Sequence, residues 1–359
     1  MEEPTTSDSA AAHRPLRLGA NLPPRFYRGG TAIARFRDEP VANDHVPEDW
    51  VASTTTLFGE AARGLSRLPG GPLLRQAVAA APEAWLGPEH VRRFGADPAL
   101  LVKLLDAGQR LPVHCHPGDD WARRHLGTRW GKTESWVVLA TGSAEAAVHL
   151  GFREEVALET LAAWVEHQEA KAILGALHRV RVEPGDAILV PAGIPHTIGE
   201  GVFVVELQQP SDLSVMLEWR DFGLDGAREG HLGVGYATAL SCVDRSGWEA
   251  ERLASLQRSR GAGRATGPGV ERVLPPEADR FFRAERVRPR PQARLEASFS
   301  VLIVTAGWGT LETGRAPATE LRRGDTVLVP HAAGEQVLRG DGLELIRCLP
   351  PHPGRADDA

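Results

Sequence analysis

Short apolar runs, each about the length of one strand and separated from the next by Gly or Pro, are the feature that most constrains the fold of this 359-residue chain. Four of them read ALLVKLLDA, ESWVVLATG, DAILVPAG and GVFVVELQQ, at residues 99–107, 134–142, 186–193 and 201–209. Runs of this length, bounded by turn residues, predict the strands of a barrel or a sandwich. We therefore expect a mostly β protein.

One segment departs from the strand pattern. Between residues 153 and 179, apolar side chains recur at helical spacing, for example at Val156, Leu161 and Val165. Side chains three or four positions apart share one face of a helix. We therefore expect a helix or a pair of helices inserted between strands of the first domain.

Composition divides the chain into two unequal β-domains. Residues 258–269 read RSRGAGRATGPG, a small and polar run that predicts a flexible linker. We expect the first domain, with its helical insertion, over residues 15–257 and the second over residues 270–350. The two ends, residues 1–14 and 351–359, are expected to be disordered tails.

The two domains share a repeated pattern. RVEPGDAILVPAG at residues 181–193 resembles ELRRGDTVLVPHA at residues 320–332. Each copy places Gly-Asp at a turn, before an apolar strand that ends at Pro. The copies lie much farther apart than the period of a solenoid, so the pattern predicts two related barrels.

Charge and composition argue against several classes of protein. The formal net charge of −6 argues against a general binder of nucleic acid or of acidic membranes. The first residues, MEEPTTSDSA, lack the basic start and apolar run of a signal peptide, and no apolar stretch of about 18 residues predicts a membrane span. The three cysteines imply no disulfide framework, so we expect a cytoplasmic protein.

The run GQRLPVHCHPGDD, residues 108–120, carries the first part of a candidate metal site. Residues two apart on a strand point to the same face, so His114 and His116 can reach one ion. Cys115 points to the opposite face and is expected to be a small buried residue. On its own, a His-x-His pair is also common on exposed surfaces.

Two further pieces complete the candidate set. Glu134 begins a strongly apolar run, and a buried carboxylate is costly unless a cation offsets its charge. That cation is a metal ion or, more simply, Lys132 or an arginine. His196 follows the Pro-rich turn PAGIP. Histidine nitrogens with one carboxylate suit Zn²⁺, and also Fe²⁺, Mn²⁺ or Ni²⁺.

Together these pieces resemble the two-part signature of the cupin superfamily. The first half, Gly, five residues, then His-x-His and a later Glu, fits Gly108, His114, His116 and Glu134. The second half, Gly, five residues, Pro-x-Gly, two residues, His, fits residues 185–196 without a gap. The long segment before Glu134 departs from the signature, and the Asn that usually follows the second half is missing. The resemblance implies two jelly-roll barrels, of which the second has lost its metal ligands.

The long segment before Glu134 and the runs around it resemble the short bacterial form of the class I mannose-6-phosphate isomerases. The runs LLVKLLDAGQRLPVHCHPGDDWA, GKTESWVVL and PAGIPHTIGEGVFVVELQQPSD carry this resemblance. It implies a zinc ion bound by His114, His116, Glu134 and His196, with His114 in place of the family's usual Gln. It also implies that Lys132 contacts the substrate.

One departure concerns an active-site arginine of that family. Met216 occupies its position, and Arg220, four residues on, is the candidate replacement. On a strand, Arg220 keeps the same face but lies about 13 Å farther along.

The resemblance implies an aldose–ketose isomerase that interconverts mannose 6-phosphate and fructose 6-phosphate by proton transfer through an enediolate. The expected partner is a small sugar phosphate, and the expected assembly is a monomer or a homodimer. Two alternatives remain open. One is a divergent metal-dependent cupin enzyme acting on another sugar or small molecule, and the other is a non-catalytic sugar-binding cupin.

Overall fold

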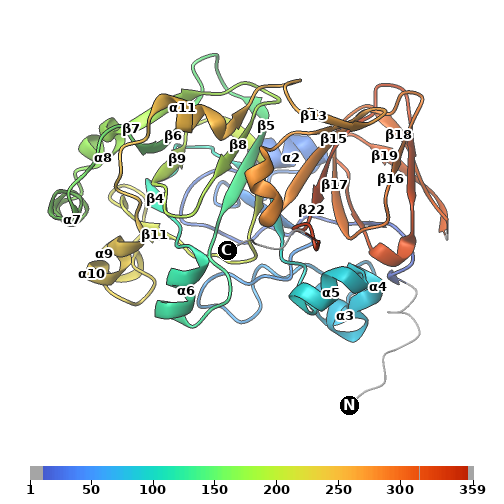
Figure 1. Ribbon diagram of the computed structural model, residues 1–359, viewed down its shortest axis with the longest axis horizontal. Coiled ribbons are helices and arrows are strands. Elements are labelled where there is room, and N and C mark those ends of the chain that lie inside the picture. The colour runs from blue at the N-terminus through green and yellow to red at the C-terminus, as the bar shows by residue number, and fades with distance from the viewer. Residues whose placement is uncertain (1–10, 315, 355–359) are drawn as a thin grey trace.

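The computed structural model describes residues 11–314 and 316–354, which fold into four antiparallel sheets forming two barrels (Figure 1). The mostly β fold class predicted from the apolar runs is confirmed. Each barrel pairs a larger sheet with a smaller one.

The first barrel contains the strands of the cupin signature. Its larger sheet has the order β12-β8-β5-β10-β3-β2 and its smaller sheet the order β11-β4-β9-β6-β7. The larger sheet consists of β2 (Glu48–Val51), β3 (Leu101–Asp106), β5 (Glu134–Thr141), β8 (Ala187–Val190), β10 (Val202–Gln208) and β12 (Gln257–Arg258). The smaller sheet consists of β4 (His114–Cys115), β6 (Ala147–Phe152), β7 (Leu177–Arg181), β9 (His196–Ile198) and β11 (Val215–Met216).

The second barrel repeats this plan. Its sheets have the orders β1-β20-β17-β22-β15-β14-β13 and β16-β21-β18-β19. The larger sheet consists of β1 (Leu16–Arg17), β13 (Arg264–Gly267), β14 (Val270–Arg272), β15 (Arg283–Val287), β17 (Ser300–Ala306), β20 (Thr326–Val329) and β22 (Glu344–Leu349). The smaller sheet consists of β16 (Gln292–Leu295), β18 (Trp308–Thr313), β19 (Ala316–Arg322) and β21 (Gln336–Arg339).

Helices lie around the barrels (Figure 1). The predicted helical insertion is confirmed as α7 (Leu158–His167) and α8 (Ala170–Ala176), between β6 and β7. The other helices are α2 (Thr31–Arg37), α3 (Leu74–Ala80), α4 (Pro82–Leu86), α5 (Pro88–Phe94), α6 (Asp119–Leu126), α9 (Gly226–Glu229), α10 (Tyr236–Ala239) and α11 (Ala250–Ser255), with 3₁₀ turns η1 (Leu240–Cys242), η2 (Pro276–Arg280) and η3 (His331–Ala333). The sequence did not predict α3, α4 and α5, because each is too short to establish a helical period and Pro begins two of them.

The repeated Gly-Asp pattern forms the same turn in both barrels. Gly185 and Gly324 have φ values of 101° and 95°, a conformation that only Gly adopts readily. The side chain of Asp186 accepts a hydrogen bond from the amide of Glu183, and Asp325 accepts one from Arg322, each at 2.9 Å. The turns lead directly into β8 and β20, so the two barrels are built on one plan.

The two larger sheets share one hydrophobic core. Val204 and Ile188 of the first barrel belong to the same buried cluster as Ile303 and Ile346 of the second. The second barrel also has an apolar interior cluster of its own, around Leu302. Because burial of apolar surface is the main favourable term in folding, this shared core holds the two barrels together.

The structure differs from the sequence prediction at the domain boundaries. The predicted linker, residues 258–269, contains β13, which extends the larger sheet of the second barrel. At the start of the chain, β1 pairs with β20 and therefore also belongs to that sheet. Ala12, assigned to the tail over residues 1–14, is fully buried in the shared core. Long-range pairing of this kind has no local sequence signal.

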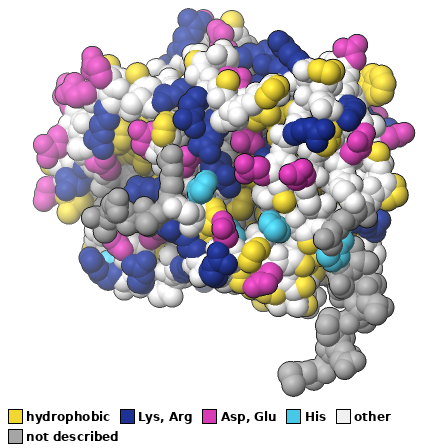
Figure 2. Space-filling view, turned by 45° about the vertical axis from the view of Figure 1, so that its right-hand side comes forward, with side chains coloured by type: hydrophobic (Ala, Val, Ile, Leu, Met, Phe, Trp, Pro, Cys, Tyr) yellow, Lys and Arg dark blue, Asp and Glu magenta, His cyan; other side chains and the backbone are white. Residues whose placement is uncertain are grey.

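The remaining parts of the two predicted tails, residues 1–10 and 355–359, lie outside the described residues. Of the helices in the described part of the chain, none is both long enough and apolar enough to cross a membrane. On the face drawn in Figure 2, basic and acidic side chains are interspersed, in keeping with the mild net charge of −6.

Candidate metal centre

Three strands of the first barrel bring the predicted metal ligands together. His114 on β4 is paired directly with His196 on β9, while Glu134 is the first residue of β5. His116 lies one residue beyond the end of β4, and Cys115 points the other way into a separate apolar cluster. The strand alternation expected from the His-x-His spacing therefore positions both imidazoles on one side.

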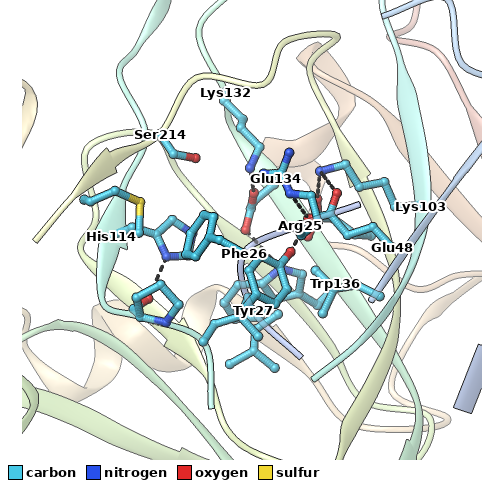
Figure 3. Close-up of a pocket in the computed structure, with 16 residues that line it drawn as sticks. Arg25, Phe26, Tyr27, Glu48, Lys103, His114, Lys132, Glu134, Trp136 and Ser214 are labelled. Atoms are coloured by element: carbon cyan, nitrogen blue, oxygen red, sulfur yellow. Dashed lines mark hydrogen bonds and ion pairs between the residues drawn. The ribbon is translucent and has the colours of Figure 1, made fainter. Parts of the chain in front are cut away.

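The ligand atoms converge inside the barrel. One ring nitrogen from each of His114, His116 and His196 lies within 4.8 Å of those of the other two. Glu134 completes the set, because its two carboxylate oxygens lie 3.0 Å from Nε2 of His116 and 3.4 Å from Nε2 of His196. Figure 3 shows His114 and Glu134 directed into the same cavity.

Backbone carbonyls orient the three imidazoles. Nδ1 of His114 donates to the oxygen of Pro112, that of His116 to Leu213 and that of His196 to Ile194, at 2.9, 2.7 and 2.8 Å. A carbonyl oxygen only accepts, so Nδ1 carries the proton and Nε2 presents its lone pair to the cluster. Histidine ligands of metal ions are commonly held in this way.

Burial keeps the rings in the form that binds metal. Burial lowers the pKa of His114 well below its usual value, and His196 and His116 add to the effect. Burial and the Lys132 ammonium lower the pKa of His116 to about 3. These two imidazoles are therefore neutral near pH 7, as metal ligation requires.

Glu134 is charged despite its burial. Burial alone would raise its pKa, but Lys132 and His116 outweigh that effect and hold the pKa well below the usual range. The Lys132 ammonium lies 3.0 Å from Oε2 of Glu134 (Figure 3). It also lies 2.9 Å from Nε2 of His116. A cationic group therefore already sits against the donor set.

The donor set fits a divalent metal ion. Nε2 of His196 is buried and has no hydrogen-bond partner among the described residues, although such an atom normally has one. Three imidazole nitrogens and one carboxylate oxygen match the ligand types and number of a tetrahedral zinc site, with bonds of about 2.0–2.2 Å. The same donors suit Fe²⁺, Mn²⁺ and Ni²⁺.

The structure does not bring Arg220 to this site. Its side chain is exposed, and its guanidinium donates to the carbonyl oxygen of His167 at 2.8 Å. Met216, by contrast, lines the cavity beside His114, its partner across β11 and β4. The expected replacement of the family's arginine by Arg220 is therefore wrong, because the chain leaves β11 after Met216 and turns to the surface.

Other charged residues, which the sequence analysis did not single out, line the same cavity. They are Arg25, Glu48, Lys103 and Glu206. Lys103 and Glu206 interrupt the apolar runs ALLVKLLDA and GVFVVELQQ, and the reasoning applied to Glu134 would have found them. Arg25 lies in a segment with no such signal.

These residues form a buried ion-pair network beside the metal ligands (Figure 3). The Lys103 ammonium lies 3.2 Å from Glu206 and 3.4 Å from Glu48. Arg25 lies 3.4 Å from Glu48 and 3.1 Å from Asp212. Burial opposes the charged form of Glu48, but Arg25 and Lys103 outweigh it and lower its pKa. Burial raises the pKa of Glu206, even though Lys103 opposes this.

The cavity joins these two groups of residues. It has a volume of about 50 Å³ and is bounded by Tyr27, Trp136 and Met216 as well as by the charged residues. A carboxyl group with a raised pKa, the three cations Arg25, Lys103 and Lys132, and part of the candidate metal site thus border one small cavity. Such perturbed groups are typical of catalytic sites.

Comparison with known proteins gives a consistent family. No family model matches the chain. It is 38% identical to the mannose-6-phosphate isomerase ManA of Bacillus subtilis (strain 168) over 194 residues, covering 53% of this chain and 56% of the relative. It is 26% identical to a mannose-6-phosphate isomerase of Streptococcus mutans over 270 residues, covering 72% and 77%. The chain spans about half the length of the first curated relatives it matches.

The fold comparison covers nearly the whole chain. The mannose 6-phosphate isomerase structure from Bacillus subtilis superposes with a TM-score of 0.68 at 22% identity, covering 93% of this chain and 99% of the other. A zinc-bound mannose 6-phosphate isomerase gives a TM-score of 0.71 at 16% identity, covering 94% and 100%. The family resemblance and the fold expected from the motifs are therefore confirmed.

We predict that His116→Ala and Glu134→Gln each lower bound metal, measured by elemental analysis of the purified chain, at least about tenfold, because each removes one of four ligands. His125→Ala is the matched control, since His125 is exposed on α6 outside the cluster. Full metal content in both site variants would contradict the assignment.

Proposed function

We propose that this chain, a relative of the mannose-6-phosphate isomerases in sequence and fold, is a metal-dependent aldose–ketose isomerase that interconverts mannose 6-phosphate and fructose 6-phosphate. The observation that carries the proposal is the convergence of His114, His116, His196 and Glu134 with Lys132 in one buried cluster beside the cavity. Zinc is the metal we propose for this site. A divalent ion bound there would supply a Lewis acid that polarises the sugar carbonyl.

Proton transfer between two adjacent carbons requires a general acid–base group. Glu206 lines the same cavity as the metal ligands, and its pKa is raised by burial. A carboxylate with a raised pKa takes and returns a proton more readily near neutral pH. We therefore propose Glu206 for this transfer, with Lys103, 3.2 Å away, holding its carboxylate in position.

A phosphorylated substrate needs cations at the cavity. Arg25 lines it, and its side chain is 14% exposed. The ion pairs with Glu48 and Asp212 orient the guanidinium. We propose that Arg25 provides the positive charge that Met216 cannot, with Lys132 contacting the sugar hydroxyl groups. A guanidinium is well suited to phosphate oxygens.

The first test is a coupled assay of mannose 6-phosphate conversion to fructose 6-phosphate. We expect turnover that a chelator abolishes and added Zn²⁺ restores, because the ligand set holds the only Lewis acid we propose. A folded, metal-loaded chain without turnover would rule out this substrate and favour a cupin enzyme acting on another small molecule.

Glu206→Gln keeps the shape of the side chain but removes its basicity. We expect kcat to fall by about 10²–10⁴-fold, as for loss of a general acid–base group, with metal content unchanged. Glu200→Gln, which makes the same change at an exposed turn outside the cavity, is the matched control. Wild-type kcat in Glu206→Gln would contradict the proposed transfer.

Arg25→Met removes the proposed phosphate partner. We expect KM for mannose 6-phosphate to rise by about tenfold or more, since a charge-assisted hydrogen bond is lost. Arg28→Met, an exposed arginine of the same segment, is the matched control. Equal KM values for the two variants would remove Arg25 from substrate binding.

A further inference from the structure

The second barrel has a polar interior at the place where the first barrel has its active cavity. The larger sheets contain the same run of neighbours, β8-β5-β10-β3-β2 in the first barrel and β20-β17-β22-β15-β14 in the second. The two Gly-Asp turns fix the alignment, because Ile188 and Val327 follow Gly185 and Gly324 at the same distance. Equivalent positions can therefore be read across the paired strands.

In this alignment, a buried ion pair of the first barrel and a buried ion pair of the second occupy equivalent positions, with the acidic and basic residues exchanged. In the first barrel, one row of paired residues crosses the larger sheet, with one residue on each strand. In order, it contains Ile188, Trp136, Glu206, Lys103 and Trp50. The equivalent row in the second barrel contains, in order, Val327, Leu302, Arg347, Glu285 and Arg272. The Glu206–Lys103 pair thus corresponds to Arg347–Glu285, whose atoms lie 3.0 Å apart.

These residues face the inside of the second barrel. Arg347 lies two residues from Leu345, and Arg283 and Glu285 lie on the same side of β15 as Val287. Leu345 and Val287 both belong to the interior core of this barrel. Since alternate residues of a strand share a face, the arginines project into the barrel at its end.

A cavity of about 600 Å³ opens at that end. Its walls include Arg272, Arg283, Arg294 and Arg347 as well as Glu89, Glu285 and Glu296, and residues 86–90, from the end of α4 into α5, close one side. Figure 1 shows α4 and α5 against this end of the second barrel, where α4 contacts η3. This cavity is far larger than the one in the first barrel, which has about 50 Å³.

Two of the four guanidinium groups have no carboxylate partner. Arg347 pairs with Glu285 and Arg272 with Asp279, at 3.0 and 2.7 Å. Among the described residues, no carboxylate lies within 4.0 Å of the guanidinium of Arg283 or Arg294. Within the described part of the chain, the Arg283 side chain donates one hydrogen bond, from Nε to the carbonyl oxygen of Pro350 at 3.0 Å.

The surroundings of Arg283 disfavour the charged form of its side chain. Burial lowers its pKa to about 10; the nearby cations Arg347 and Arg272 add to this effect, while the carboxylates Glu285 and Asp279 oppose it. The Arg283 side chain is partly buried and has no carboxylate in direct contact among the described residues. Partial removal of a cation from water is costly, and an anion from solution in direct contact would offset that cost. Among the described residues of the second barrel no cluster of metal-binding side chains is found, and Glu335, the residue aligned with His196, is exposed on the surface.

We propose that the mouth of the second barrel binds a small molecule carrying a phosphate group, with Arg283 as the principal contact and Arg294 at the rim. Two cations lacking carboxylate partners call for a dianion rather than a monoanion, which favours a phosphate over a single carboxylate. Arginine forks are suited to several oxygens on one centre. The site is separate from the metal centre and independent of the activity proposed for it.

The test is calorimetric titration of the full, metal-loaded chain with inorganic phosphate at low ionic strength, where ionic binding is least screened. We expect Arg283→Gln to weaken one phosphate-binding event by about tenfold or more, since a charge-assisted pair is lost. Arg290→Gln, an exposed arginine of the same barrel outside the cavity, should bind like the wild type. Thermal unfolding without phosphate verifies that the variants are folded.

Arg294→Gln provides a second variant at an exposed position, where the fold is not at risk, and should weaken the same event. Acetate, a monoanion, should compete poorly, and a phosphorylated sugar should bind at least as well as phosphate. Unchanged phosphate binding in both Arg283→Gln and Arg294→Gln, or equal binding of acetate and phosphate, would overturn the proposal. The isomerase assay should be unaffected by Arg283→Gln.

Discussion

The burial of the Glu134 carboxylate inside an apolar barrel is the constraint on which the site depends. Removing such a charge from water costs several kcal/mol unless cations and hydrogen bonds replace the lost hydration. Here Lys132 lies 3.0 Å away, and the Nε2 atoms of His116 and His196 complete the surroundings. The carbonyl groups that hold each Nδ1 make this arrangement rigid. A metal ion would satisfy the same set of donors, which is why the geometry indicates a metal centre.

The two barrels show how one backbone plan can carry different chemistry. The Gly-Asp turn, the strand order and the pairing register recur in both, because these depend on backbone conformation and on the alternation of apolar residues. The polar residues at equivalent positions differ. Glu206 and Lys103 in the first barrel correspond to Arg347 and Glu285 in the second. The folds are thus alike while the charge presented to a ligand is reversed.

The candidate metal ligands could be proposed from the sequence because their signal is local. His114 and His116 are two residues apart on one strand, and Glu134 interrupts an apolar run, so strand alternation and the cost of burial are enough. Arg25 gave no such signal. It lies in a segment without regular structure and reaches the cavity only through the folding of the chain. The prediction for Arg220 was wrong because it assumed that one strand continues from Met216 to Arg220, whereas β11 ends at Met216.

The sequence by itself determined the fold class, the repeated turn and the strands that carry His114, His116, Glu134 and His196, because each depends on residues that are neighbours in the chain. Only the tertiary structure decided which distant groups share a cavity, and it placed Arg25 beside the metal ligands. It also placed β1 and β13 in the sheet of the second barrel. Such pairings are decided by burial of apolar surface and by register between distant strands, and neither is written in any short stretch of sequence.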